Sequence, residues 1–511
     1  EHKENAHGFF IYDSAVRVPL IIRLPGEKEG GKRIANQVRS IDIMPTILNC
    51  LDNNPSLSVQ GQSLLPYILN LDGDLDLSAY SETYWPNYHY GWSELKSLRQ
   101  GQYKFIEAPK PELYDVFADP GERENLINRM ASLGHEMQRN LNTLMENYSA
   151  ADIDEVQPQR VDDDTLTKLQ ALGYLGSFRT SPKENGARLA DPKDKIELYN
   201  EIKIAQFLVT EEKMEQAEQK IKKVLNKDSS VLEARYILGN IFTKQEKFEE
   251  AIAEYQKALA VEVDYYDAIF GLALAYKKSG REDDAIIGFQ RLMELDNRDT
   301  KPLLHLSDIY LQLGQFDDAL THLKSASEID PESPIFHNRL GAVYLKMEML
   351  DLAEKEIKEA MAIERSVPLL NAHFNMALLH EARGELDQAV LEYKKEQETS
   401  PFNFQADFNL GLLYVKTKEL DKAIKEFKSS IQKNEEYGSA YVFLAKAYMD
   451  TGMDLNEAAQ MAEKGISLTP DLKTTVLAHF VLADLYNRLG RYQESQQHVS
   501  KAKQLQKTLS Q

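Results

Sequence analysis

The sequence repeats itself every 34 residues through its C-terminal part, and this period constrains the fold more than any other feature. In each unit a small residue is followed three positions later by a large residue, and about nine positions after that by another small one. Small residues let the two helices of a unit approach closely, while the large residue fills the gap to a neighbour. We therefore expect an all-α array of stacked helical hairpins. The triplets are Ala205, Leu208, Ala217; Gly239, Phe242, Ala251; Ala273, Tyr276, Ala285; Ser307, Tyr310, Ala319; Gly341, Tyr344, Ala353; Ala377, His380, Ala389; Gly411, Tyr414, Ala423; Ala445, Tyr448, Ala458; and Ala483, Tyr486, Ser495.

Two further positions of the unit support the hairpin interpretation. A large residue at the twenty-fourth position is expected to fill the groove to the next unit. Pro331, Pro401 and Pro470 are expected to end second helices, because proline cannot continue a helical ladder. With these positions the sequence resembles the tetratricopeptide-repeat (TPR) family over about nine repeats, between residues 193 and 508. The residues at the twenty-fourth position are Tyr255, Phe289, Leu323, Ile357, Tyr393 and Phe427.

The TPR resemblance implies a solenoid whose first helices offer a concave surface to a protein or peptide partner. Polar residues of the first helices that lie outside the packing positions are the candidates for binding. As a row, their Asn and His side chains suit recognition of a peptide backbone, although each one alone also fits a solvated helix residue. The polar segment from Gln493 to Gln506 is expected to cap the stack. The candidate partner-binding residues are Arg235, Asn240, His305, Asp308, His337, Asn338, Asn375, Asn409 and Lys446.

Charge and cysteine content exclude several classes of function. The net charge is −21, with 81 acidic and 60 basic residues, so nucleic acid is not an expected partner. The single cysteine, Cys50, rules out an intrachain disulfide framework and a Cys/His zinc cluster. No apolar run is long enough to span a bilayer. The sequence begins with Glu1 followed at once by motif-like residues, which predicts a fragment whose signal peptide or anchor, if one exists, lies upstream.

The N-terminal residues do not repeat, and their hydrophobic pattern is mixed α/β. The apolar run Val18 to Ile22 is typical of a buried strand, and the segment from Ile41 to Leu51 is helix-like. Further elements are expected as a hairpin of residues 95–99 and 103–106 around the Gln100-Gly101 turn, a short strand 113–115 and a long polar helix 122–148.

Five ordered sequence blocks in this region resemble sulfatase-family hydrolases of the alkaline-phosphatase superfamily. The blocks are EHKENAHGFFIYDSAVRVPLIIRLPG, VRSIDIMPTIL, VQGQSLLP, LKSLRQGQYKFI and ELYDVFADPGERENL. In the family the first block directly follows an Asp-His or Asp-Asn metal pair. The resemblance therefore implies that residues 1–150 form a partial α/β domain, the C-terminal part of an alkaline-phosphatase-like sulfatase fold. Residues 151–192 then form a linker and junction helix before the TPR solenoid of residues 193–508.

The resemblance also implies a chemistry whose main parts are absent from this sequence. Relatives use a divalent cation, Ca or Mg, and a nucleophile derived from Cys or Ser to open sulfate esters. No Cys-x-Pro-x-Arg motif occurs, since Cys50 stands in LNCLDNN, and the metal pair would precede Glu1. By resemblance His7 could contact the transferring group, with His2 a weaker candidate. A structural histidine at a strand edge is the alternative for His7, and no metal ligands are expected within this chain.

The sequence thus predicts a fragment of a sulfatase-like hydrolase joined to a TPR protein-interaction module. Sulfuric ester hydrolysis is expected of the parent protein, not of this chain alone. The alternatives are a hydrolase of phosphate or phosphonate esters, a non-catalytic TPR scaffold, and a pseudoenzyme. The sulfatase resemblance favours the cell envelope or periplasm for the parent, while TPR arrays occur on both sides of a membrane.

Overall fold

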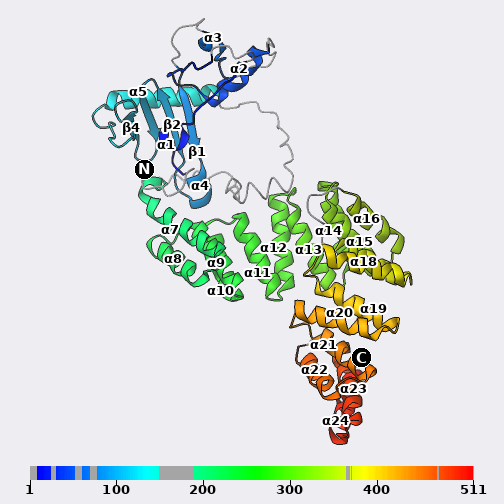
Figure 1. Ribbon diagram of the computed structural model, residues 1–511. Coiled ribbons are helices and arrows are strands. Elements are labelled where there is room, and N and C mark those ends of the chain that lie inside the picture. Colours follow the sequence, from blue (N-terminus) through cyan, green and yellow to red (C-terminus); the bar gives the residue numbers. More distant parts are fainter. Residues whose placement is uncertain are drawn as a thin grey trace. The chain divides into compact units, whose positions relative to one another are not determined.

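The computed structural model describes residues 9–24, 30–51, 60–69, 77–148, 189–363, 369, 371–468 and 471–509 (Figure 1). The chain divides into two units, Glu1–Leu295 and Asp296–Gln511. The first unit holds a small α/β region and the beginning of a helical array. The second unit consists of helices in its described part. None of the helices in the described ranges combines the length and the apolarity that crossing a membrane requires.

A four-stranded antiparallel sheet organises the α/β region, with the strands side by side in chain order (Figure 1). Its middle hairpin joins β2 and β3 through the Gln100-Gly101 turn, with Gln100 opposite Tyr103. This hairpin and the following strand confirm the sequence prediction. Helix α5 packs on β2 and β3 through Met137 and Leu141, which are both buried. The strands are β1 (Ala79–Thr83), β2 (Leu95–Gln100), β3 (Tyr103–Glu107) and β4 (Glu112–Asp115).

The helices of this region are short apart from α5 (Ala131–Tyr148). The sequence predicts that this helix begins at residue 122, but it begins nine residues later. Asp119 accepts the backbone N–H groups of Arg123 (2.6 Å) and Glu124 (2.8 Å), and such local side-chain bonds compete with the helical ladder. The predicted helix from Ile41 is confirmed as η2 and α2. The short helices are α1 (Asp13–Val16), η2 (Ser40–Asp42), α2 (Ile43–Cys50), α3 (Leu65–Ile68) and α4 (Trp85–Tyr90).

The apolar run Val18 to Ile22 is not the buried strand that the sequence predicts. Its backbone is extended but pairs with no strand among the described residues, and Val18 and Ile21 are 78% and 90% exposed. A strand needs a neighbour for its N–H and C=O groups, and the described sheet ends at β1 and β4. Strand β1 itself was not expected from the sequence.

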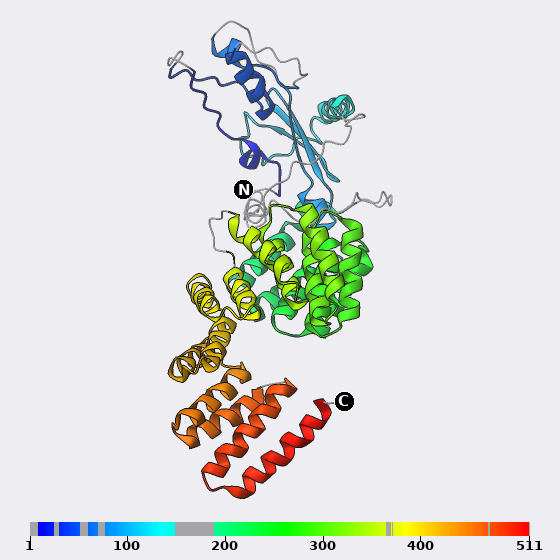
Figure 2. The same ribbon diagram turned by 90° about the vertical axis from the view of Figure 1, so that its right-hand side faces the viewer.

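The helices from α7 onward follow one another as nine hairpins, three in the first unit and six in the second (Figures 1 and 2). Within each hairpin the two helices pack against each other, as the TPR pattern predicts. The polar last helix agrees with the expected cap. The helices are α7 (Pro192–Thr210), α8 (Met214–Lys227), α9 (Leu232–Lys244), α10 (Phe248–Val261), α11 (Tyr266–Lys278), α12 (Glu282–Leu295), α13 (Thr300–Gln312), α14 (Phe316–Ile329), α15 (Pro334–Lys346), α16 (Leu350–Ala362), α17 (Ala372–Ala382), α18 (Leu386–Thr399), α19 (Phe404–Lys416), α20 (Leu420–Lys433), α21 (Gly438–Thr451), α22 (Leu455–Leu468), α23 (Leu472–Arg488) and α24 (Tyr492–Leu509).

The large residues at the twenty-fourth position fill the space between hairpins, as predicted. Tyr255 is 1% exposed, and the five residues at equivalent positions are fully buried. A Cβ atom added at Gly239 or Gly271 would lie within 2.5 or 2.6 Å of the Tyr255 ring. The two glycines belong to consecutive first helices, so Tyr255 is held between them and fixes the spacing of α9 and α11.

Candidate functional site

Both catalytic candidates of the N-terminal region, His2 and His7, lie outside the described residues. The described part begins at Phe9, in the middle of the first sulfatase-like block. Three buried charged residues, together with the partly buried Arg99, hold this block on the sheet. They form a network that the sequence did not reveal, because its members come from three separate segments.

Lys104 of β3 is the centre of this network and is 1% exposed. Its Nζ lies 2.9 Å from Asp13 Oδ1 and 2.9 Å from Glu122 Oε1. Asp13 also pairs with Arg99 at 2.7 Å, and its backbone N–H donates to Glu122. Burial raises the pKa of the Glu122 carboxyl, while the Lys104 charge opposes that shift. The network fixes α1 to the sheet and is structural, because each of its charges is matched within it.

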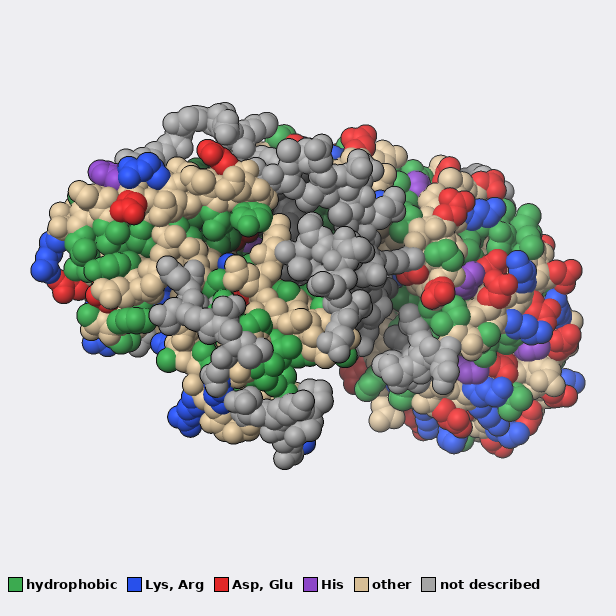
Figure 3. All heavy atoms as spheres, turned by 90° about the horizontal axis from the view of Figure 1, so that it is seen from above, with side chains coloured by type: hydrophobic (Ala, Val, Ile, Leu, Met, Phe, Trp, Pro, Cys, Tyr) green, Lys and Arg blue, Asp and Glu red, His purple; other side chains and the backbone are tan. Residues whose placement is uncertain are grey.

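The segment after α1 forms one wall of an open cleft of about 1500 Å³. Basic side chains, among them Arg17, Arg23, Lys32 and Arg33, line this cleft together with the apolar run around Ile21. Exposed apolar side chains continue onto α2, where Met44 is 60% and Ile47 51% exposed. Figure 3 shows such hydrophobic side chains, in green, gathered at the surface in several places. We refer to the exposed apolar residues of segment 16–51 as the uncovered face.

A second face of the α/β region packs against the first helix of the TPR array. Phe9 stacks on Tyr199 of α7 with ring centroids 4.3 Å apart, and Tyr90 meets the same ring edge-on at 5.8 Å. Trp92 stacks on Tyr90 at 4.7 Å. Phe9, Tyr90, Trp92 and Tyr199 are all at most 3% exposed. These four rings form the core of what we call the junction.

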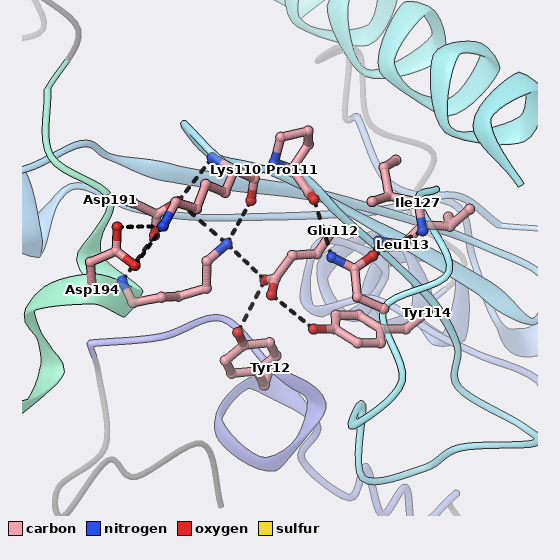
Figure 4. Close-up of polar contacts among 11 residues, drawn as sticks. Tyr12, Lys110, Pro111, Glu112, Leu113, Tyr114, Ile127, Asp191 and Asp194 are labelled. Carbon is pink, nitrogen blue, oxygen red and sulfur yellow. Dashed lines mark hydrogen bonds and ion pairs between the residues drawn. The ribbon is translucent and has the colours of Figure 1, made fainter. Parts of the chain in front are cut away.

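Polar contacts fix the beginning of α7 at the same junction (Figure 4). Asp191 caps the helix by accepting the N–H of Lys193 at 2.9 Å, and its other oxygen accepts the N–H of Lys110 at 2.9 Å. Lys193 Nζ donates to the Lys110 carbonyl at 2.6 Å and lies 3.3 Å from Glu112 Oε2. The Glu112 carboxylate also accepts the hydroxyl of Tyr12 at 3.0 Å. A cap shared between two modules means that α7 begins where the sheet places it.

A partly buried lysine of α7, Lys203, extends the junction on the side of the TPR array. The Lys203 ammonium lies 5.5 Å from the Trp85 ring centre and 5.6 Å from that of Tyr199, within cation–π range. Burial lowers the pKa of Lys203, and burial beside Lys203 lowers the pKa of His89 to about 4. Nearby, burial raises the pKa of the Glu233 carboxyl to about 7. Titratable groups near the junction are therefore biased toward their neutral forms.

The nine candidate partner-binding residues lie on first helices, and most contact their own repeat or the next one. Asn338 and Asn375, in consecutive first helices, are 6% and 7% exposed and hydrogen-bond to each other at 2.9 Å. Asn240 accepts the hydroxyl of Tyr255 at 2.7 Å, and Asn409 hydrogen-bonds that of Tyr393. The structure thus places these amides at contacts between packed helices.

The remaining candidates are charged or half-buried. Arg235 and His337 each pair with a glutamate 19 positions later, at 3.1 and 2.7 Å. Asp308 pairs with Arg339 of the next first helix, a residue outside the nine candidates. Lys446 pairs with Asp450 one helical turn away at 2.8 Å, and His305 is half-buried on α13. Asp308 and Lys446 keep 30% and 37% of their side chains accessible.

Comparisons with known proteins match different families to the N-terminal α/β region and to the helical array. Residues 6–149 match the family described as N-sulphoglucosamine sulphohydrolase, C-terminal. Residues 239–280 and 308–348 match one tetratricopeptide-repeat family, and residues 267–296 and 369–440 match two others. This chain joins a sulfatase C-terminal region to a TPR array. The sulfatase C-terminal region contains the sheet, the uncovered face and its half of the junction.

Sulfatases are also the relatives of this region among curated proteins. Arylsulfatase K of Canis lupus familiaris is 27% identical over 169 residues, covering 29% of this chain and 29% of that protein. An N-acetylglucosamine-6-O-sulfatase of Bacteroides thetaiotaomicron is 27% identical over 162 residues, again with 29% of each chain covered. The chain therefore spans less than a third of the length of these sulfatases.

Solved structures similar to this chain include TPR proteins. One from Parabacteroides merdae is 16% identical, with a TM-score of 0.41, over 48% of this chain and 98% of its own. Another, from Thermus thermophilus, is 23% identical, with a TM-score of 0.31, over 36% of this chain and 100% of its own.

Proposed function

We propose that the parent of this chain hydrolyses sulfate esters and carries its TPR array as a protein-binding arm fixed to the sulfatase C-terminal region. The observation that carries the proposal is the junction. Four nearly buried aromatic rings and the shared Asp191 cap join α7 to the sulfatase region. A packed contact of this kind holds α7 in a fixed position on the sulfatase C-terminal region, whereas a flexible linker would not.

The uncovered face supports the sulfatase half of the proposal. Monomeric proteins rarely leave large apolar surfaces exposed, and several large apolar side chains of segment 16–51 are in water. Ile21 is 90%, Val18 78% and Met44 60% exposed, and they lie in segments that match the family. We assign this face to contact with the catalytic part of the parent.

A divalent cation belongs to the sulfatase resemblance, and Ca or Mg is the expected ion. Within the described residues of the sulfatase C-terminal region, no three His, Cys, Asp or Glu side chains bring ligand atoms together. The carboxylates of Asp13 and Glu122 are paired with Lys104 and are poor candidates. We therefore derive no catalytic step through a metal in this chain, and place the metal ligands of the parent elsewhere.

Hydrolysis by the parent tests the first half of the proposal. The gene product with its upstream sequence restored should release the aryl alcohol from an aryl sulfate faster than from the matching phosphate or phosphonate. A faster phosphate or phosphonate reaction would reassign the ester. Inactivity on all three, with an intact metal site, would favour a scaffold or pseudoenzyme.

Partner capture tests the second half, for a protein or peptide bound on the first helices. The double variant Asp308→Ala/Lys446→Ala changes two partly exposed charged candidates of the second unit, on α13 and α21. Its matched control, Asp317→Ala/Lys324→Ala, makes the same changes on α14, a second helix. We expect the first variant to lose partner recovery and the control to retain it. Equal recovery from both would remove the first-helix surface from the proposal.

A further inference from the structure

In two hairpins, charged or histidine side chains at the same three positions link the first helix to the second. In the second hairpin Arg235 lies 3.1 Å from Glu254, and Lys257 lies 2.6 Å from the same carboxylate. The sixth hairpin repeats this arrangement. There the Nδ1 atom of His373 and the Nζ atom of Lys395 each lie 2.7 Å from Glu392. In both hairpins one carboxylate contacts a side chain of the first helix and a lysine three residues later.

In the fifth hairpin the first-helix residue and the carboxylate are retained, but the lysine is replaced by a glutamate. His337 on α15 lies 2.7 Å from Glu356 on α16, which repeats the contact across the hairpin. The residue three positions after Glu356 is Glu359, where the other two hairpins have lysine. Glu359 Oε2 lies 3.5 Å from His337 Nδ1. One imidazole nitrogen and two carboxylates thus converge at a point that otherwise holds one carboxylate and a lysine.

The second ring nitrogen of His337 is held by the backbone. Its Nε2 lies 3.1 Å from the Pro331 carbonyl oxygen, six residues earlier. In the second hairpin Arg235 Nε donates at 3.0 Å to the Ser229 carbonyl, also six residues earlier, so this is a recurring feature of the hairpin. An N–H at Nε2 that donates to a carbonyl leaves the Nδ1 lone pair directed at the carboxylates. This is the outer-shell arrangement by which proteins orient a metal-binding histidine.

The distances suit a small divalent cation. The ligand atoms of His337, Glu356 and Glu359 all lie within 4.8 Å of one another. Metal–ligand bonds of about 2.0–2.2 Å in tetrahedral geometry separate two ligand atoms by about 3.3 Å. The separation of Nδ1 from Glu359 is close to this value, and that from Glu356 needs to widen by about 0.6 Å. Carboxylate rotamers supply such a movement.

Burial and neighbouring charge are also compatible with an ion. The side chains of His337 and Glu356 are 15% and 14% exposed, while Glu359 is 47% exposed. The site is thus anchored on its inner side and open to a water ligand on its outer side. Lys355 Nζ lies 3.9 Å from Glu359 Oε1, but its side chain is 63% exposed and free to turn toward solvent. Across the described residues, these three side chains form the group of His, Cys, Asp and Glu that meets the geometry of a metal site.

We propose that the fifth hairpin binds one divalent transition-metal cation of the Zn²⁺ class between His337 Nδ1, Glu356 and Glu359. Imidazole nitrogen with carboxylate oxygen is a donor set that such ions accept. The ion links α15 to α16 at the place where the second and sixth hairpins use a lysine. The site is independent of the sulfatase chemistry, because it lies in a hairpin of the TPR array.

Calorimetric titration of the full chain with Zn²⁺, after treatment with a chelator, tests the proposal. We expect one Zn²⁺ bound by the wild type and an affinity lower by at least about tenfold in Glu359→Gln and Glu359→Lys. The lysine variant reproduces the charge pattern of the sixth hairpin. The matched control is Glu328→Lys on α14, an exposed position with the same charge change, which should bind as the wild type does.

A second measurement separates loss of the site from loss of folding. In chelator the helical melting temperatures of the wild type and of Glu359→Gln should agree, and added Zn²⁺ should raise only that of the wild type. Equal Zn²⁺ affinity in the wild type and both Glu359 variants would overturn the assignment. Absence of saturable binding in the wild type would overturn it as well.

Discussion

The sulfatase C-terminal region has two apolar surfaces, of which one is buried and the other is exposed to solvent. At the junction, Phe9, Tyr90 and Trp92 are at most 3% exposed because Tyr199 and the start of α7 cover them. On the uncovered face, Val18 and Ile21 are more than three-quarters exposed. Both surfaces belong to one fold, so the difference in exposure depends on which other part of the protein packs against each surface. The TPR array supplies the partner of the first surface, and we assign the partner of the second to the catalytic part of the parent.

Removing the charge inside the sheet should have the largest effect. Lys104→Ala leaves Glu122 and one oxygen of Asp13 buried without their cation, which we expect to lower the unfolding free energy by about 3–5 kcal/mol. The control Arg129→Ala removes a cation of the same region that is 72% exposed and paired with Glu124, and should cost under about 1 kcal/mol. Urea denaturation followed by tryptophan fluorescence measures both. Similar losses in the two variants would contradict the structural role of Lys104.

Truncating the ring that covers the junction should have the next largest effect. Tyr199→Ala leaves a cavity beside Phe9 and should cost about 3 kcal/mol. Both tryptophans of the chain, Trp85 and Trp92, lie in or beside the junction, so fluorescence reports on it selectively. Phe207→Ala, on the same helix but 60% exposed, is the control and should change the midpoint little. If the two variants unfold alike, the covered and uncovered surfaces do not differ as described.

Acidification should change the stability of the junction by a smaller amount, through His89 and Glu233 with opposite effects. The folded-state pKa of His89 is about 4, below its ordinary value of 6.5, so the unfolded chain binds more protons between these values. The stability that His89 contributes is present above pH 6.5 and is lost as the pH falls toward 4. From pH 7 to pH 5 we expect the His89 contribution, taken as the wild type minus His89→Gln in fluorescence-detected urea denaturation, to fall by about 1–2 kcal/mol. Glu233, whose carboxyl pKa burial raises to about 7, takes up a proton in the folded chain over the same range and shifts stability in the opposite direction in both proteins. A difference between the two proteins that does not change with pH would remove His89 from the junction.

Changing the uncovered face should have the smallest effect on folding. Val18→Ser/Ile21→Ser alters side chains that are already in water, so the unfolding free energy should move by less than about 0.5 kcal/mol. Self-association measured by light scattering should fall, because the exposed apolar surface shrinks. A large loss of stability would show that these side chains are covered within the chain.

The periodic part of the fold could be predicted from the sequence. Tyr255 and its five equivalents occupy the same place in six units, so one pattern fixes both their burial and the packing of these hairpins. The β2–β3 hairpin was predictable because Gln100-Gly101 is a local turn signal between two apolar runs.

The junction could not be predicted in the same way. Phe9, Tyr90 and Tyr199 are far apart in the sequence and follow no common period, and a contact of this kind leaves no local signal. Trp92 packs in the junction and Trp85 borders Lys203 of α7, and no local pattern in the sequence indicates either contact. Asn338 and Asn375 were selected as surface residues. Their burial depends on how consecutive first helices are placed, which the pattern of a single helix does not contain.

The position of Tyr255 between Gly239 and Gly271 also limits how this array can change in length. The Tyr255 ring needs Gly239 in its own hairpin and Gly271 in the next, so this contact depends on two units at once. Deletion of the third hairpin, α11 and α12, would bring His305 to the place of Gly271, against the Tyr255 ring. This contact therefore restricts which hairpin can follow the second one.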